Sequence, residues 1–130
     1  MDKVRLIRGA ALLSLCAAYL QGGLVKLLDF NGAIAEMVHF GLQPAALMAA
    51  AVIALELGGS ALVLSGHGRR GAALALAAFT LAASCIANPF WSAAGPQHLP
   101  LMNAFFEHLG LVGGWVLVAC LDGQTRQERP

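Results

Sequence analysis

Two ionisable side chains lie inside long apolar stretches of the sequence, Lys26 and Glu56. A carboxylate at the centre of a bilayer costs about 2.5–3.5 kcal/mol even on the most lenient insertion scale. We therefore expect Glu56 to be paired with another group or to serve a function. Counting ~1.5 Å of rise per residue, we expect the backbones of Lys26 and Glu56 to differ in depth by roughly 12 Å. Direct pairing then requires the Lys26 side chain to stretch.

Two interpretations of these residues stay open. In the first, Glu56 pairs with Lys26, or is protonated and bonds a neighbouring helix, and only stabilises the helix packing. In the second, Glu56 and Lys26 bind a polar head group or transfer a proton.

A second polar group is expected near the outer membrane boundary, formed by His39, His98, Asn103, Glu107 and His108. Histidine and glutamate relay protons, bind metals or hydrogen-bond a carbonyl. The sequence contains no HxxH, HxxxH or CxxC spacing, so we expect no metal and no bis-histidine haem. His39 and His98 are expected to be polar loop residues. His108 is the candidate because it lies deeper, with Glu107 beside it.

The three cysteines are expected at different depths, Cys16 and Cys120 in the inner half and Cys85 towards the outer side. A disulfide requires a Cα separation of about 4.4–6.8 Å, so no intrachain disulfide is expected. Without a CxxC motif, a disulfide-exchange mechanism is disfavoured. The cysteines are interpreted as small apolar packing residues.

The elements that must position these side chains are membrane helices. The chain of 130 residues is 58% hydrophobic and 12% charged, with a mean hydropathy of +0.72. Soluble domains carry roughly 25% charged residues, and about 20 apolar residues cross a bilayer as a helix. We therefore predict an all-α membrane protein, one four-transmembrane-helix bundle over residues 1–130. The predicted spans are about 9–28, 45–64, 71–87 and 104–121.

Three further expectations complete this architecture. The first apolar stretch resembles a signal peptide, and we interpret it as a retained transmembrane helix. A short interfacial helix is predicted between the first two spans, capped by Asp29 or Asn31, with Phe30, Ile34 and Val38 on its apolar face. Trp91 is expected at interface depth, where indoles prefer to lie.

The distribution of charge predicts the topology. Of eight Lys and Arg residues, seven lie at the N-terminus, in one short turn and at the C-terminus: Lys3, Arg5, Arg8, Arg69, Arg70, Arg126 and Arg129. Cations of this kind stay in the cytoplasm, so we expect a multi-pass protein of the cytoplasmic (inner) membrane with both termini cytoplasmic. The net charge of +1 disfavours nucleic acid as a partner.

Several short motifs, in order, resemble the DoxX family of four-helix membrane proteins. They are Gly22-Gly23-Leu24-Val25-Lys26-Leu27-Leu28, Phe40-Gly41-Leu42-Gln43-Pro44, Glu56-Leu57-Gly58-Gly59, Leu64-Ser65-Gly66, Asn88-Pro89-Phe90-Trp91, Phe105-Phe106-Glu107-His108-Leu109 and Gly113-Gly114. The resemblance covers nearly the whole chain and carries over Lys26, Glu56 and Trp91. The family usually has His in place of Asn88 and Lys-Asn in place of Glu107-His108.

The resemblance implies a quinone-linked redox membrane subunit. Such a subunit would bind a quinone between Lys26, Glu56, Trp91, Glu107 and His108. It would hold no haem, metal or flavin of its own and would need a redox partner protein or a second copy of itself. Lys26 or His108 would hydrogen-bond a quinone carbonyl, and Glu56 would orient the ring or pass a proton.

The alternative is a non-catalytic membrane anchor or assembly partner of a redox complex, and a small-molecule carrier is a weaker third option. The sequence leaves open whether the protein is an enzyme. A ring-shaped or lipid-like ligand near Glu56 would favour the first interpretation. A dry interior with Lys26 paired to Glu56 would favour the anchor.

Overall fold

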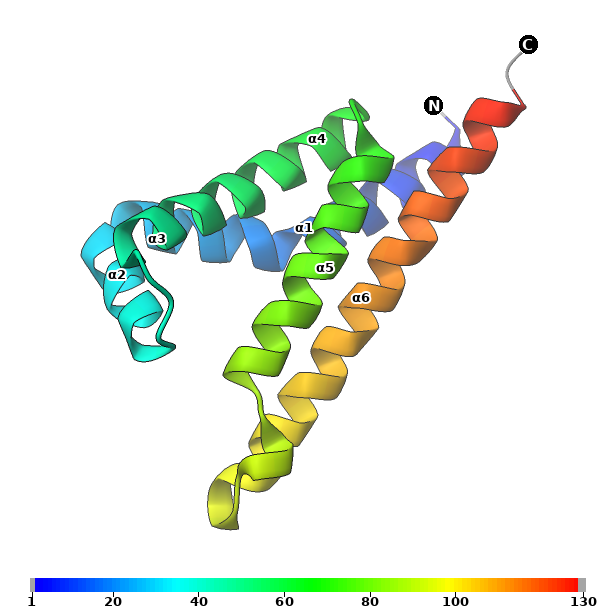
Figure 1. Cartoon of the computed structure of the whole chain (residues 1–130). Coiled ribbons are helices and arrows are strands. Elements are labelled where there is room, and N and C mark those ends of the chain that lie inside the picture. The colour runs from blue at the N-terminus through cyan, green and yellow to red at the C-terminus, as the bar shows by residue number, and fades with distance from the viewer. Residues whose placement is uncertain (1, 129–130) are drawn as a thin grey trace. The chain divides into compact units, whose positions relative to one another are not determined.

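A computed structural model describes residues 2–128, with only the backbone of Arg126; Arg129, one of the cations of the predicted topology, lies outside the described residues. All regular structure in residues 2–128 is helical, which confirms the predicted all-α class. Four helical segments are long and apolar enough to cross a membrane: Lys3–Leu28, Ala45–Ser65, Arg69–Ser92 and Gly95–Thr125 (Figure 1). The chain divides into two compact units at Ala72 and Ala73.

The first unit begins with helix α1, Lys3–Leu28. Asp2 caps it, because its carboxylate accepts a hydrogen bond from the backbone N–H of Val4 at 3.2 Å. The helix therefore starts six residues before the predicted span. Its N-terminal cations belong to the same continuous helix as its apolar residues.

Helix α2, Phe30–His39, follows directly. Asp29, one of the two residues predicted to cap this helix, is its N-cap. Its carboxylate accepts a hydrogen bond from the N–H of Gly32 at 3.0 Å. Ala33 and Met37 are buried, whereas Phe30 and Val38 are exposed.

The second membrane segment consists of three pieces, α3 (Ala45–Ile53), the π-helix η1 (Ala54–Gly58) and α4 (Gly59–Ser65). Ala45 and Ala49 of α3 form a buried cluster with Ala33 and Met37 of α2. Gly66 ends α4 in the left-handed conformation, with φ of 82°. Glycine adopts this conformation without the strain that a Cβ would add.

Helix α1 runs antiparallel to the second segment. Gly22 lies against Glu56, and the Cys16 thiol lies against the carbonyl of Ser60. In this register α3 begins about one helical turn beyond the end of α1. Helix α2 packs against this first turn of α3, here called the overhang of α3. The end of the first membrane segment and the beginning of the second therefore lie at different depths, which corrects the assumption behind the predicted 12 Å offset of Lys26 and Glu56.

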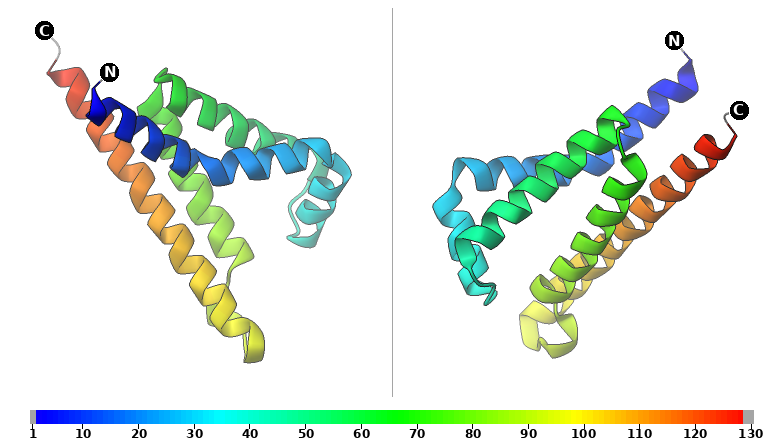
Figure 2. Two further views of the ribbon diagram at one scale, coloured as in Figure 1. Left: turned by 180° about the vertical axis from the view of Figure 1, so that it is seen from behind. Right: turned by 45° about the horizontal axis from the view of Figure 1, so that its top comes forward.

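The second unit holds most of α5 (Arg69–Ala87), the short 3₁₀ helices η2 (Phe90–Ser92) and η3 (Gly95–Gln97), and α6 (His98–Gln127). Asn88 follows α5, and its amide donates a hydrogen bond to the Ser84 hydroxyl at 3.1 Å. Helix α6 begins and ends six residues outside the predicted fourth span. It is the long helix that runs from yellow to red in Figure 2.

Candidate functional site

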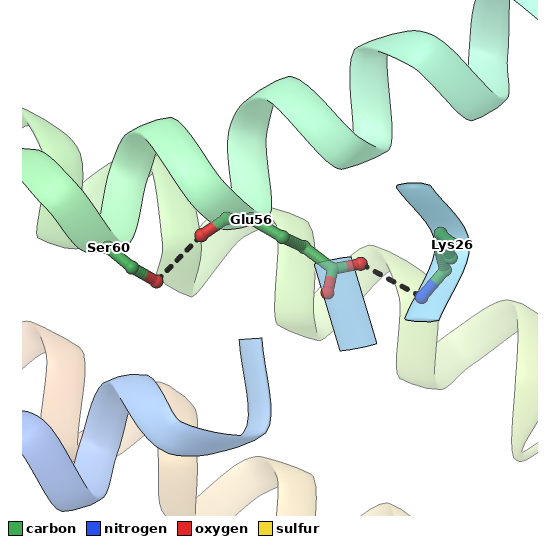
Figure 3. Close-up of polar contacts among 3 residues, drawn as sticks. All are labelled: Lys26, Glu56 and Ser60. Atoms are coloured by element: carbon green, nitrogen blue, oxygen red, sulfur yellow. Dashed lines mark hydrogen bonds and ion pairs between the residues drawn. The ribbon is translucent and has the colours of Figure 1, made fainter. Parts of the chain in front are cut away.

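The ammonium of Lys26 and the carboxylate of Glu56 form an ion pair. Lys26 Nζ lies 3.1 Å from Glu56 Oε1, and the two side chains are 18% and 6% exposed (Figure 3). The sequence allowed this pair but predicted it to be stretched. The overhang of α3, about one helical turn, removes roughly half of the predicted 12 Å offset, and the lysine side chain spans the rest.

Two glycines let α1 approach close enough for this contact. A Cβ on Gly22 would lie 2.8 Å from Glu56 Oε2 and 3.5 Å from Lys26 Nζ. A Cβ on Gly23 would lie 2.7 Å from the side chain of Leu57. Small residues allow helix backbones to meet in lipid, where packing drives association. The Gly22-Gly23 pair therefore has a defined role, which is to make room for Glu56 and Leu57.

Glu56 lies in the middle of the π-helix η1. Single π turns within α-helices often occur at functional sites. One turn further on, the hydroxyl of buried Ser60 donates a hydrogen bond to the backbone carbonyl of Glu56 at 2.6 Å. Figure 3 shows this bond beside the ion pair. Ser60 was not identified from the sequence, although its spacing of four residues from Glu56 was the available signal.

The ion pair leaves hydrogen-bonding capacity unused. A lysine ammonium has three donors. Within residues 2–128, Lys26 donates to Glu56 Oε1. Lys26 belongs to a segment long and apolar enough to cross a membrane, where unpaired donors are costly. A ligand oxygen that only accepts hydrogen bonds, such as a carbonyl, fits these donors.

Glu36 adds a second carboxylate to this region. It is exposed on α2 and interacts electrostatically with Glu56. Two carboxylates and one ammonium therefore influence one another in the first unit. Lys26 is the cation of this group, so its removal would leave negative charge uncompensated.

Trp91 belongs to an aromatic cluster in the second unit. Its ring centroid lies 5.3 Å from that of Phe90 and 5.5 Å from that of Phe105, in edge-to-face arrangements. The indole is nevertheless 58% exposed. This combination suits the membrane interface, where an apolar ring meets a polar boundary.

The histidines of the second unit make backbone contacts. His98 Nδ1 lies 3.0 Å from the carbonyl oxygen of Phe90 and 3.1 Å from that of Ala93, so it closes the turn before α6. His108 Nδ1 lies 2.6 Å from the carbonyl oxygen of Ala104, where it acts as the donor. Its other ring nitrogen is then the acceptor. Glu107 is exposed, whereas His108 is half-buried.

The structure therefore brings together Lys26 and Glu56 within the first unit. Trp91, Glu107 and His108 belong to the second unit. Their participation in a shared binding site with Lys26 and Glu56 stays a prediction. His39 lies on α2 in the first unit, where its ring contacts that of Phe40.

Two buried residues of α6 were not identified from the sequence. Trp115 is completely buried, and Asp122 is buried near the end of the helix. Asp122 was assigned to a polar tail because the predicted span stopped at residue 121. The signal that could have placed it is continuous helical spacing beyond that residue.

The described residues contain no group of three His, Cys, Asp or Glu side chains arranged to hold a metal ion. Cys16 is buried and free, and Cys85 and Cys120 are exposed and free. The buried thiol of Cys16 packs between α1 and α4.

Comparison with known proteins identifies a family to which the chain is similar and one relative. The DoxX family profile matches residues 10–89, more than half of the chain. The chain is also similar to the inner membrane protein YphA of Escherichia coli (strain K12), at 25% identity over 97 residues. That alignment covers 75% of this chain and 69% of the relative. No solved structure matches.

Proposed function

Because the chain belongs to the DoxX family and is a multi-pass protein of the inner membrane, we propose that it is the membrane subunit of a redox complex and binds a quinone head group beside Lys26 and Glu56. The observation that carries this proposal is the Lys26–Glu56 pair: of the three ammonium donors, one bonds Glu56 Oε1 at 3.1 Å, and the described part of the chain supplies no further acceptor. A quinone carbonyl accepts hydrogen bonds and has none to donate, so it complements those donors.

Each residue has a stated role in this proposal. Lys26 donates a hydrogen bond to a carbonyl oxygen of the ring, and Glu56 holds Lys26 in place. The Glu56 carboxylate, whose second oxygen lies over Gly22, takes up protons one at a time and passes each to a quinone oxygen as the ring is reduced. A quinone takes up two electrons and two protons when it is reduced. The electrons come from a partner protein that carries a flavin, metal or haem.

The short contact between Lys26 and Glu56 also supports a second candidate function. Two charges that neutralise each other inside a membrane need no ligand. In that case the protein is a non-catalytic anchor or assembly partner, and the ion pair only joins α1 to the second membrane segment.

Copurification separates the two functions. Wild-type protein, Lys26→Met and the control Ser14→Ala are extracted from membranes, and their bound lipids, quinones and proteins are measured by mass spectrometry. Ser14 is an exposed residue of the same helix that bonds the Ala10 carbonyl. We expect wild type and Ser14→Ala to retain quinone above its proportion in the membrane, and Lys26→Met to lose it. A redox partner without quinone enrichment would support the anchor. Absence of both would contradict both functions.

A further inference from the structure

Apart from Lys26, the Lys and Arg residues of the first unit gather at the end opposite α2. Lys3, Arg5 and Arg8 are exposed on the first two turns of α1. The antiparallel register that sets Gly22 against Glu56 and Cys16 against Ser60 brings Arg8 level with the turn between α4 and α5. In Figures 1 and 2 the N-terminus and this turn lie at the same end of the unit. Arg70, on the first turn of α5, adds an exposed cation there.

This end of the unit has almost no compensating negative charge. The sequence contains no Asp or Glu from Lys3 to Leu28, or between Glu56 and Glu107. Asp2 lies next to the cations, and its carboxylate bonds the N–H of Val4 as the helix cap. Arg69 is held differently from its neighbour, because its Nε donates to the Val63 carbonyl at 2.8 Å. The four outward-facing cations are therefore Lys3, Arg5, Arg8 and Arg70, here called the basic end.

Large apolar side chains alternate with these cations. Val4, Leu6 and Ile7 are 68%, 62% and 69% exposed. A surface that presents aliphatic and cationic side chains from the same two helical turns fits a boundary between hydrocarbon and negative charge. Lysine and arginine stems extend along apolar surface while their charged groups reach outward. Water alone would suit the cations but not the aliphatic residues.

We propose that the basic end is a binding site for anionic phospholipid. The acyl chains cover Val4, Leu6 and Ile7, and the headgroup phosphate pairs with Lys3, Arg5, Arg8 and Arg70. Clusters of basic residues beside a membrane helix attract anionic lipid, with a contribution of about 1 kcal/mol from each cation. This contribution corresponds to roughly a fivefold change in relative affinity for each cation. The proposal does not depend on the quinone site.

Lipid selectivity is the quantity to measure. The full-length protein is reconstituted in phosphatidylcholine vesicles containing trace spin-labelled phosphatidylglycerol or phosphatidylcholine. Electron paramagnetic resonance then gives the motionally restricted fraction of each labelled lipid. We expect wild type to prefer phosphatidylglycerol and the preference to fall in 1 M salt. The variant Lys3→Gln/Arg5→Gln/Arg8→Gln/Arg70→Gln should lose that preference, because it removes all four cations and each contributes roughly fivefold.

A matched control removes charge at the other end of the unit. Asp29→Asn/Glu36→Gln should keep the selectivity of wild type, because both residues lie at the α2 end. Equal restriction of the two lipids by wild type would overturn the proposal without any variant. Unchanged selectivity in the fourfold variant would also overturn it. Loss of selectivity in millimolar inorganic phosphate would assign the site to free phosphate and not to lipid.

Discussion

The contact between Lys26 and Glu56 depends on residues that carry no charge. Gly22 leaves space beside Glu56 Oε2, and Gly23 admits the side chain of Leu57. Ser60 bonds the backbone carbonyl of Glu56 and so supports the π turn that presents the carboxylate. The short motifs around residues 22–26 and 56–60 are thus two sides of one contact between helices.

Substitution at Gly22 should disturb this contact. In Gly22→Ala the new Cβ would lie 2.8 Å from Glu56 Oε2, so the carboxylate must move away from its present position. Overpacking of this kind typically destabilises by about 1–3 kcal/mol. We expect a loss of this size in the free energy of unfolding, measured by titration with a denaturing detergent.

The control for this prediction is Gly58→Ala, because a Cβ on Gly58 meets nothing within 4 Å. Gly58 lies in the same π-helix as Glu56. Equal effects of Gly22→Ala and Gly58→Ala would show that the close approach at Gly22 is unimportant.

At the scale of the elements, the turn between α4 and α5 depends on backbone conformation. Gly66 has φ of 82°, and its N–H donates to the Leu62 carbonyl at 3.0 Å. A left-handed conformation costs a residue with a Cβ roughly 1–2 kcal/mol. Gly66→Ala should therefore lower the free energy of unfolding by about that amount.

Gly71 provides the matched comparison in the same region. It lies within α5, and a Cβ there meets nothing within 4 Å. Alanine stabilises a helix interior by about 0.5–1 kcal/mol relative to glycine. Gly71→Ala should thus raise the free energy of unfolding. The interpretation of the turn is wrong if the two variants shift the denaturation midpoint in the same direction.

The sequence was sufficient to predict these elements but not their relative depths. Long apolar stretches separated by Gly, Pro and charged residues predict four membrane helices, and Asp29 or Asn31 predicts the start of α2. Helix ends were misplaced where the helix continues beyond the apolar stretch, as in Lys3–Arg8 and in α6 after Leu121. The hydropathy of a sequence indicates which residues cross the hydrocarbon core of the membrane. It does not indicate how far the helix continues on either side of that core.

The candidate site was predicted in part for a related reason. Glu56 and Lys26 stand out because charge is rare in membrane helices. Their distance could not be deduced, because it depends on how far α3 extends past α1. The bonds of His98 to a turn and of Ser60 to a carbonyl depend on local geometry that residue type alone does not determine.

At the scale of the whole molecule, the predicted orientation places both termini in the cytoplasm. It rests on seven cations in the termini and one short turn. Single cysteines at Gly95 and at Gln124 test it, in a variant with Cys16, Cys85 and Cys120 changed to Ala. An impermeant thiol reagent should label Gly95→Cys in intact cells and leave Gln124→Cys unmodified. The reverse pattern would mean that the orientation is inverted.

Lys26 and Glu56 compensate each other's charge within the membrane segments. Removal of one partner from a buried pair typically costs about 3–5 kcal/mol, since the other charge stays behind. Lys26→Met should therefore destabilise the protein by an amount in this range, and Glu56→Gln should relieve much of that loss in the double variant.

A double-mutant cycle in detergent, with Lys26→Met, Glu56→Gln and both changes together, measures this coupling directly. We expect a coupling free energy of about 2–3 kcal/mol between the two substitutions. Coupling near zero, with each single variant as stable as wild type, would contradict the ion pair as the centre of this protein's structure and function.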